Sequence, residues 1–351
     1  VYSSTAIISH VTYGSTMRFA MTHLLAIAVG LVMSLGILAV PTDRLRRYAK
    51  ALVIVSGIFL LLVKMVGLEV GGATRWFRIG PLSIQPSEFA QLALVVYMAD
   101  YLARKRDQIQ HFRDGLLPPI IITGGMAGLV LLQPDLGTAI VMVSVTGVLL
   151  LLAKARWQHM SLLALLGVAA LAVLIGSEGY RMRRMMAFMN PWQDPAGVGF
   201  QILQSYLAFA NGGVVGQGLG ASMQKLFYLP GAHTDFIFAV IADELGLIGT
   251  TAVLGLFVLL ISCGIRMALH TEAIFEKYLI AGCVSLIGLE AIVNMAVVTG
   301  LLPTKGLPLP LLSYGGTAMV GNLLACALIL RASRGEPAPV ISTAHLRPAT
   351  A

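Results

Sequence analysis

Long apolar runs separated by short polar segments dominate the pattern along the chain. A membrane-spanning helix needs about 20 predominantly apolar residues. Nine segments reach or approach that length, at roughly 20–40, 51–68, 88–103, 115–132, 136–153, 161–177, 236–265, 278–300 and 309–330. The pattern therefore predicts an all-α polytopic membrane protein. The opening stretch VYSSTAIISH is expected to be the outer end of one more helix, which gives about ten helices with nine complete here.

Composition agrees with lipid as the solvent and excludes several classes of protein. The 351 residues are 57% hydrophobic and 11% charged, whereas soluble domains carry about 25% charged residues. The three cysteines lack C-x-x-C spacing, and neither H-E-x-x-H nor a phosphate-binding P-loop occurs. We therefore expect no metal site and no ATP-driven pump. The net charge of +8 is spread over short loops, so we expect no nucleic-acid partner.

The basic residues predict the orientation of the spans. Lys and Arg accumulate in cytoplasmic loops, and alternation of the spans places five short basic segments on one side, at 41–50, 104–113, 154–156, 266–277 and 331–334. The outer side then receives 69–87, 178–235 and 301–308. Residues 1–334 are predicted to form a single transmembrane domain, and the Pro/Ala-rich tail 335–351 to be disordered and cytoplasmic.

The outer segment 178–235 is too long and too apolar to be a plain connector. Its stretch YRMRRMMAFMNPW mixes arginines with methionines and aromatics, which is typical of a helix lying on lipid head groups. The following FQILQSYLAFANGG predicts a second short helix ended by its glycine pair. Arg181, Arg183 and Arg184 are expected either to bind an anionic ligand or to anchor the segment to lipid phosphates, and both interpretations stay open.

Asp235, at the outer mouth of the span that begins near 236, has two interpretations as well. Asp is a common N-cap, because its carboxylate accepts hydrogen bonds from the first N–H groups of a helix. The outer loops also supply Arg75, Trp76, Glu88 and Lys305. Cations beside carboxylates and apolar grooves are the layout expected for a lipid-linked phosphate substrate that enters sideways from the membrane.

Several long motifs resemble those of one known family, the SEDS proteins (shape, elongation, division and sporulation). The similar stretches span nearly the whole chain and include GGATRWFRIGPLSIQPSEFAQLA, QPDLGTA, NPWQDPAGVGFQILQSYLAFANGG, GLGASMQKLFYLPGAHTDFIFAVIADELG and NMAVVTGLLPTKGLPLPLLSYGG. The run PTKGLPLPLLSYGG is closer to the division branch, FtsW, than to the elongation branch, RodA. The resemblance implies a bundle of about ten transmembrane helices with interfacial helices in a long outer loop.

It also implies an activity, a place and partners. The family polymerises lipid II into glycan strands by inverting glycosyl transfer at the outer face of the bacterial cytoplasmic (inner) membrane, for the septal wall in the FtsW branch. A class B penicillin-binding transpeptidase and divisome membrane proteins would be the partners, beside membrane lipids. No cofactor is required with certainty, and a divalent cation such as Mg²⁺ stays open.

The family motifs carry over residue by residue. The essential aspartate of the H-T-D motif matches Asp235, the tryptophan of G-x-x-R-W matches Trp76, the glutamate of Q-P-S-E matches Glu88, and the P-T-K-G lysine matches Lys305. We expect Asp235 to be catalytic and the substrate to be bound by Arg75, Trp76, Glu88, Arg181, Arg184, Lys225, His233, Thr234, Lys305 and Ser313. The chain departs from the usual motifs at Gly231, commonly Glu, and at Gln91, commonly Lys.

Two other functions stay open as alternatives. A lipid II flippase would need a polar path across the bilayer, which Lys64, Asp243, Glu244 and Glu290 could line, but no inverted repeat is evident. A RodA-like elongation polymerase that controls cell shape is the other alternative. Glu290 and Asn294, four residues apart, are expected to hydrogen-bond neighbouring helices instead of substrate. Because the reactive residues gather on one side, we favour the polymerase.

Overall fold

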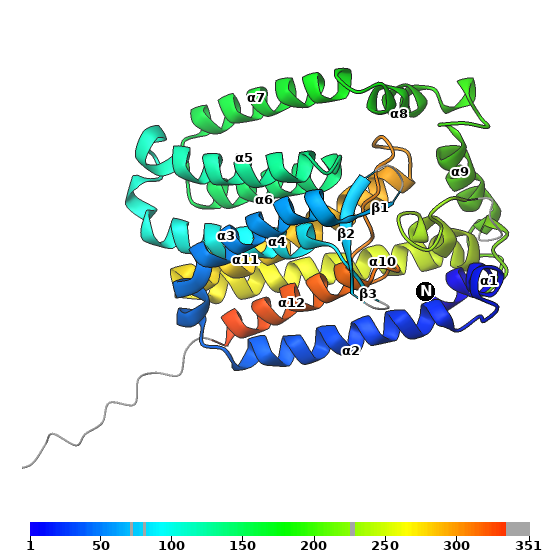
Figure 1. The fold of residues 1–351 in the computed structure, drawn as a ribbon, viewed down its shortest axis with the longest axis horizontal. Helices are drawn as coiled ribbons and strands as arrows, with labels where there is room; N and C mark the ends of the chain where they lie inside the picture. The colour runs from blue at the N-terminus through cyan, green and yellow to red at the C-terminus, as the bar shows by residue number, and fades with distance from the viewer. Residues whose placement is uncertain (71–72, 80–81, 225–228, 335–351) are drawn as a thin grey trace, which may run out of the picture.

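The computed structural model describes residues 1–70, 73–79, 82–224 and 229–334. Its long helices run side by side, horizontally in Figure 1, with connections at two ends. The helices are α1 (Tyr2–Tyr13), α2 (Arg18–Ala39), α3 (Thr42–Val66), α4 (Pro86–Arg104), α5 (Leu117–Leu131), α6 (Leu136–Leu152), α7 (Trp157–Gly176), α8 (Gly179–Met189), α9 (Phe200–Gly212), α10 (Ile237–His270), α11 (Ile274–Val298) and α12 (Gly316–Ser333). Short helical turns lie at Arg106–Gln108, Phe112–Leu116 and Pro191–Gln193.

Each of the nine expected spans coincides with a helix, from α2 to α7 and from α10 to α12. Within the described residues, seven helical segments are long and apolar enough to cross a membrane, and α6 is a shorter apolar helix. The chain is a multi-pass membrane protein. Lys225 and the tail 335–351 lie outside the described residues.

Two helices, α4 and α11, form the centre of the bundle. Most of α4 is buried, and it packs against α3 and α11, while α12 packs along α2. At the periphery, α7 contacts α6 and α8, and none of its residues is buried. Its apolar surface requires lipid around it, which agrees with its composition.

A small sheet, which the sequence analysis did not anticipate, lies at one end of the bundle. Strands β1 (Leu68–Val70), β2 (Ala73–Ile79) and β3 (Leu82–Ile84) form an antiparallel meander in the order β1-β2-β3. Because side chains alternate along a strand, neighbouring residues on β2 face opposite sides of the sheet. We call this end of the bundle the sheet end, and the opposite end, which carries the connections 40–41, 105–116, 153–156 and 271–273, the basic end (Figure 1).

The segment 178–235 contains α8 and α9, as the sequence predicted, and a loop that pairs with a break in α10. The break is at Gly246, whose φ is 63°. On one side of it, Gln217 N donates to Asp243 O (2.9 Å) and Gly218 N to Glu244 O (3.0 Å). On the other side, Leu247 N donates to Gly213 O (2.9 Å) and Ile248 N to Val214 O (3.2 Å). The loop 213–218 therefore satisfies backbone groups that the broken helix leaves unpaired.

Candidate active site

Asp235 ends a compact turn directly before α10. Thr234 N and Phe236 N both donate to Gly231 O, at 3.0 and 3.1 Å. Gly231 has φ of 73°, a left-handed conformation that glycine adopts without steric cost. This geometry suits glycine at the position where the chain departs from the family motif. The N-cap of α10 is Phe236, with no side-chain capping bond, so the N-cap interpretation of Asp235 is wrong.

The backbone of the turn is held from two other elements. Asn294 Nδ2 on α11 donates to Asp235 O and to Leu307 O, both at 2.7 Å. Ser313 Oγ donates to Thr234 O (2.5 Å) and Tyr314 N donates to His233 O (2.9 Å). These bonds use main-chain oxygens, and they leave the carboxylate of Asp235 free to act while fixing its position.

A cavity of about 440 Å³ opens beside this turn. We call it the cationic pocket. Its walls come from β2, the turn before α6, the junction of α7 with α8, and the loop 303–306, and its charged lining residues are Arg75, Asp135, Arg181, Arg184 and Lys305. A Cβ built on Gly306, another lining residue, would lie 3.1 Å from Asp235 Oδ2. The carboxylate of Asp235 therefore lies against the wall of the cationic pocket, and only a hydrogen at position 306 separates the backbone from it.

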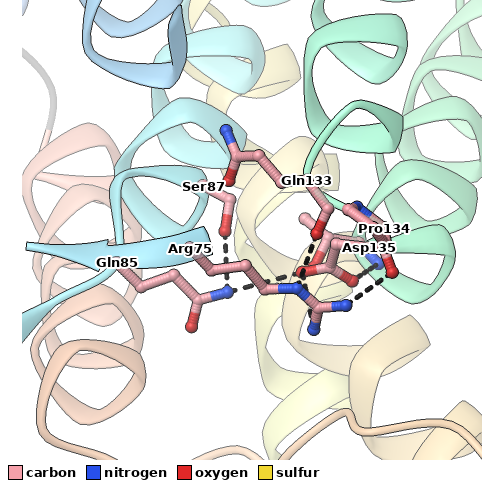
Figure 2. A network of polar contacts seen from close by, with 7 residues as sticks. Arg75, Gln85, Ser87, Gln133, Pro134 and Asp135 are labelled. Carbon is pink, nitrogen blue, oxygen red and sulfur yellow. Dashed lines mark hydrogen bonds and ion pairs between the residues drawn. The ribbon is translucent and has the colours of Figure 1, made fainter. Parts of the chain in front are cut away.

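Arg75 lines the cationic pocket, and Figure 2 shows the polar contacts that hold its side chain. Its Nε donates to Gln133 O (2.8 Å) and its Nη2 to Pro134 O (2.5 Å), and its Nη1 lies 3.8 Å from Asp135 Oδ2. Asp135 also accepts from Gln85 Nε2 at 3.4 Å. Two carbonyls and one buried carboxylate thus orient the guanidinium, so its position is fixed before substrate binds.

Asp135 has a second set of partners that tie it to α6. It accepts from Thr138 N at 3.2 Å and from Thr138 Oγ1 at 3.0 Å. It is therefore the N-cap of α6 and the counter-charge of Arg75 at once. The match to QPDLGTA pointed to this turn, but Asp135 itself was missed as a site residue because an aspartate before a helix is ordinarily only a cap.

Burial shifts the titration of the two central groups in opposite directions. It raises the pKa of Asp235 to about 6, with Arg184 opposing the shift and Asp135 adding to it. Burial lowers the pKa of Lys305 to about 8, opposed by the negative charge of Asp135. A carboxylate with a pKa near 6 is a stronger base than an ordinary one and is still ionised at pH 7. Between about pH 6 and 8 the site therefore holds an ionised base beside a protonated lysine.

Several other residues expected at the site lie outside the lining of the cationic pocket. Arg183 and Trp76 do not line the cationic pocket. Thr234 Oγ1 donates to Gly231 O (3.3 Å), whereas His233 packs among the rings of Phe19 and Tyr314, 5.9 and 5.8 Å away. Burial lowers the pKa of His233, so it is neutral at pH 7.

Three of the expected polar residues act inside the bundle. Ser313 is buried, and its hydroxyl bonds protein backbone, accepting from Leu309 N (2.8 Å) and donating to Thr234 O. Glu88 lies against Gly321 of α12, and Glu290 and Gln91 are both buried.

The described residues contain no group of three His, Cys, Asp or Glu side chains that could hold a metal ion. Two carboxylates, Asp135 and Asp235, lie in or against the cationic pocket, and Asp135 is already bonded to Arg75, Gln85 and Thr138. These residues do not form a protein-made cage for a divalent cation.

Comparison with known proteins gives consistent matches over nearly the full chain. A family model described as "Cell cycle protein", covering FtsW, RodA and SpoVE, matches residues 1–337. A probable peptidoglycan glycosyltransferase FtsW of Trichlorobacter lovleyi is 41% identical over 95% of this chain and 88% of its own length. Stage V sporulation protein E of Bacillus subtilis is 39% identical over 95% of this chain and 92% of its own.

Two solved structures share the fold. A chain from a structure described as the coordination of polymerization and crosslinking by a peptidoglycan synthase complex is 32% identical, with a TM-score of 0.75 over 90% of this chain and 89% of that one. The rod shape determining protein RodA of Thermus thermophilus is 28% identical, with a TM-score of 0.68 over 95% of this chain and 93% of its own. These matches agree with a helical, multi-pass membrane fold for this chain.

Proposed function

The chain belongs to the FtsW, RodA and SpoVE family of cell cycle proteins, and on that premise we propose how its residues carry out peptidoglycan glycosyl transfer. Relatives about 40% identical are named peptidoglycan glycosyltransferases, and this chain is an enzyme of that kind that polymerises lipid II. The observation that carries the site assignment is the placement of Asp235 against the wall of a pocket lined by four cations.

The cationic pocket takes the pyrophosphate of the donor. Arg75, Arg184 and Lys305 line it, and Arg181 is held beside them by bonds from its Nη1 to Leu174 O (2.8 Å) and from its Nε to Tyr180 Oη (3.0 Å). Positioned cations stabilise negative charge that builds on a leaving group, without reorganising at the moment of reaction. They also make a protein acid unnecessary, because pyrophosphate is already a good leaving group.

Asp235 is the general base. The 4-hydroxyl oxygen of the acceptor N-acetylglucosamine attacks C1 of the donor N-acetylmuramyl unit, and its proton passes to the carboxylate of Asp235. The C1–O bond to pyrophosphate breaks, its electron pair leaves with undecaprenyl pyrophosphate, and the configuration at C1 inverts. A base in this role contributes about 10²–10⁴ in rate. A divalent cation, if one takes part, would be brought by the pyrophosphate.

The sheet end is placed at the outer face of the membrane in this proposal. The basic end carries the short Lys/Arg loops, such as 41–50 and 104–113, which accumulate on the cytoplasmic side. The active residues then meet lipid II outside. A class B penicillin-binding transpeptidase is the proposed partner, consistent with a neighbour in a peptidoglycan synthase complex, and a divisome role follows the FtsW relatives.

The test is reconstitution. Purified chain, alone and with the candidate transpeptidase, is given labelled lipid II, and products are separated by gel electrophoresis. We expect glycan polymer and release of undecaprenyl pyrophosphate. If lipid II crosses vesicles unchanged and no polymer forms in either preparation, the chain is a transporter and the glycosyltransferase proposal fails.

A further inference from the structure

The basic end holds a second recess, which the proposed reaction does not use. Its volume is about 570 Å³, within the range of roughly 300–1,000 Å³ common for ligand pockets. It lies between the first turns of α3 and the last turns of α4, at the opposite end of the bundle from the start of α10 (Figure 1). The residues that line it are Asp43, Arg46, Arg47, Lys50, Asp100 and Arg104.

One buried carboxylate organises two of these cations. Asp100 is 5% exposed. Its Oδ1 lies 3.1 Å from Arg46 Nε, and its Oδ2 lies 2.9 Å from Arg104 Nε and 2.7 Å from Arg104 Nη2. A guanidinium has five N–H donors, so both arginines keep donors for a further anion. Their orientation is fixed before any ligand arrives.

The recess carries more positive than negative charge. Four of its lining residues are cations and two are acids, and Asp100 is shared between two arginines. Arg47 and Lys50 are exposed and form no ion pair within the part of the chain that the structure describes. Arginine forks match the geometry of phosphate oxygens, so the recess has the chemistry of a phosphate site.

The spacing along α3 indicates what kind of phosphate. The lining positions 43, 46, 47 and 50 lie on one helical face. The same face continues through Ile54, Ile58 and Leu61, which are 64%, 51% and 48% exposed. A row of cations therefore runs directly into a row of uncovered apolar side chains. A free phosphate would use only the first row, whereas a phosphate joined to acyl chains would use both.

We propose that this recess binds the phosphate of an anionic phospholipid, with an acyl chain lying along Ile54, Ile58 and Leu61. Basic pockets between spanning helices bind anionic head groups in this way. The site is separate from the lipid II site, because the two lie at opposite ends of the bundle, and it ties the basic end to a membrane of a particular charge.

Native mass spectrometry of the detergent-purified full chain tests the proposal. The probes are dioleoylphosphatidylglycerol and dioleoylphosphatidylcholine, which have the same acyl chains and differ in net charge. The test variant is Arg47→Gln with Lys50→Gln. The matched control is Arg113→Gln with Lys154→Gln, which removes two exposed cations from the same end of the bundle but outside the recess.

We expect the test variant to bind phosphatidylglycerol about 10- to 30-fold more weakly than the unmodified chain, and the control to bind it within about twofold. Neither should change phosphatidylcholine binding. Asp43→Asn removes an acid from the recess, so it should strengthen phosphatidylglycerol binding about three- to fivefold. This opposite shift separates a specific site from loss of folding.

Three results would overturn the proposal. The first is equal weakening by the test and control pairs, which would mean a diffuse surface charge. The second is unchanged binding in the test variant. The third is displacement of phosphatidylglycerol by inorganic phosphate at equal concentration, which would make the ligand a soluble phosphate and leave the apolar row unexplained.

Discussion

The Asp235→Asn variant separates the catalytic role of this residue from its effect on stability, because it is expected to lower activity while raising thermal stability. The amide cannot take a proton from the acceptor hydroxyl, so we expect glycan polymerisation to fall by about 10²–10⁴. The turn itself should persist, because Asn294 and Ser313 hold it through the backbone oxygens of residues 235 and 234. The variant is therefore expected to fold.

The same substitution should make the protein more stable at neutral pH. Burial raises the pKa of Asp235 from 3.8 to about 6, so the folded state disfavours the ionised carboxylate. For an acid whose folded pKa is raised, the associated stability is present below the unfolded pKa and is lost as pH rises through the folded pKa. At pH 7 the ionised group costs up to about 3 kcal/mol, which Asn removes.

The assay pairs polymerisation of labelled lipid II with thermal unfolding in detergent at pH 4 and pH 7. We expect the Asn variant to unfold at a higher temperature than the unmodified chain at pH 7, and at nearly the same temperature at pH 4. Asp194→Asn, in the same long loop but exposed, is the control and should change polymerisation by less than about twofold. An Asn variant that polymerises at a near-normal rate would refute the assignment of Asp235 as base.

Further predictions concern pH, packing, charge and orientation. Because the reaction uses an ionised Asp235 and a protonated Lys305, with pKa values of about 6 and about 8, kcat/KM should fall below pH 6 and above pH 8; a flat profile from pH 5 to 9 would contradict this. Gly306→Ala places a Cβ 3.1 Å from Asp235 Oδ2 and should lower kcat about 10- to 100-fold with unfolding unchanged. Arg184→Gln should raise the lipid II concentration needed for half-maximal rate, whereas Arg183→Gln, outside the pocket, should not. In a background without native cysteines, Leu219→Cys, at a position that is 79% exposed, should react with an impermeant maleimide on intact cells and Gln108→Cys only after permeabilisation; the reverse labelling would invert the topology.

The spans were predictable because each is a long apolar run, and lipid leaves the backbone few options other than a helix. The two helices of segment 178–235 were also predictable, since the arginines and methionines of α8 favour a helix that lies at a membrane interface. The sheet was not, because β1 and β3 are each three residues long and depend on pairing with β2 for their conformation. Short strands of this kind carry little local signal.

Single residues of the candidate site were predictable where a family motif contains them, but their arrangement in space was not. Asp235 and Lys305 were found in the sequence through their motifs. Their convergence with Asp135, about a hundred residues before Asp235, depends on how α6 and α10 each pack against α11, which local sequence does not encode. For the same reason the sequence does not distinguish Arg75 and Arg184, which line the pocket, from Trp76 and Arg183, which do not.

The break at Gly246 gives the first half of α10 a mechanical role. Gln217, Gly218, Leu247 and Ile248 donate the bonds that tie loop 213–218 to the two sides of Gly246, and an unpaired backbone group costs several kcal/mol in a hydrocarbon environment. The loop 213–218 and this half of α10 are therefore expected to move as one unit. Asp235 lies just before that half-helix, in the turn that Asn294 and Ser313 hold, so a displacement of loop 213–218 would reach the carboxylate through a rigid segment about three turns long.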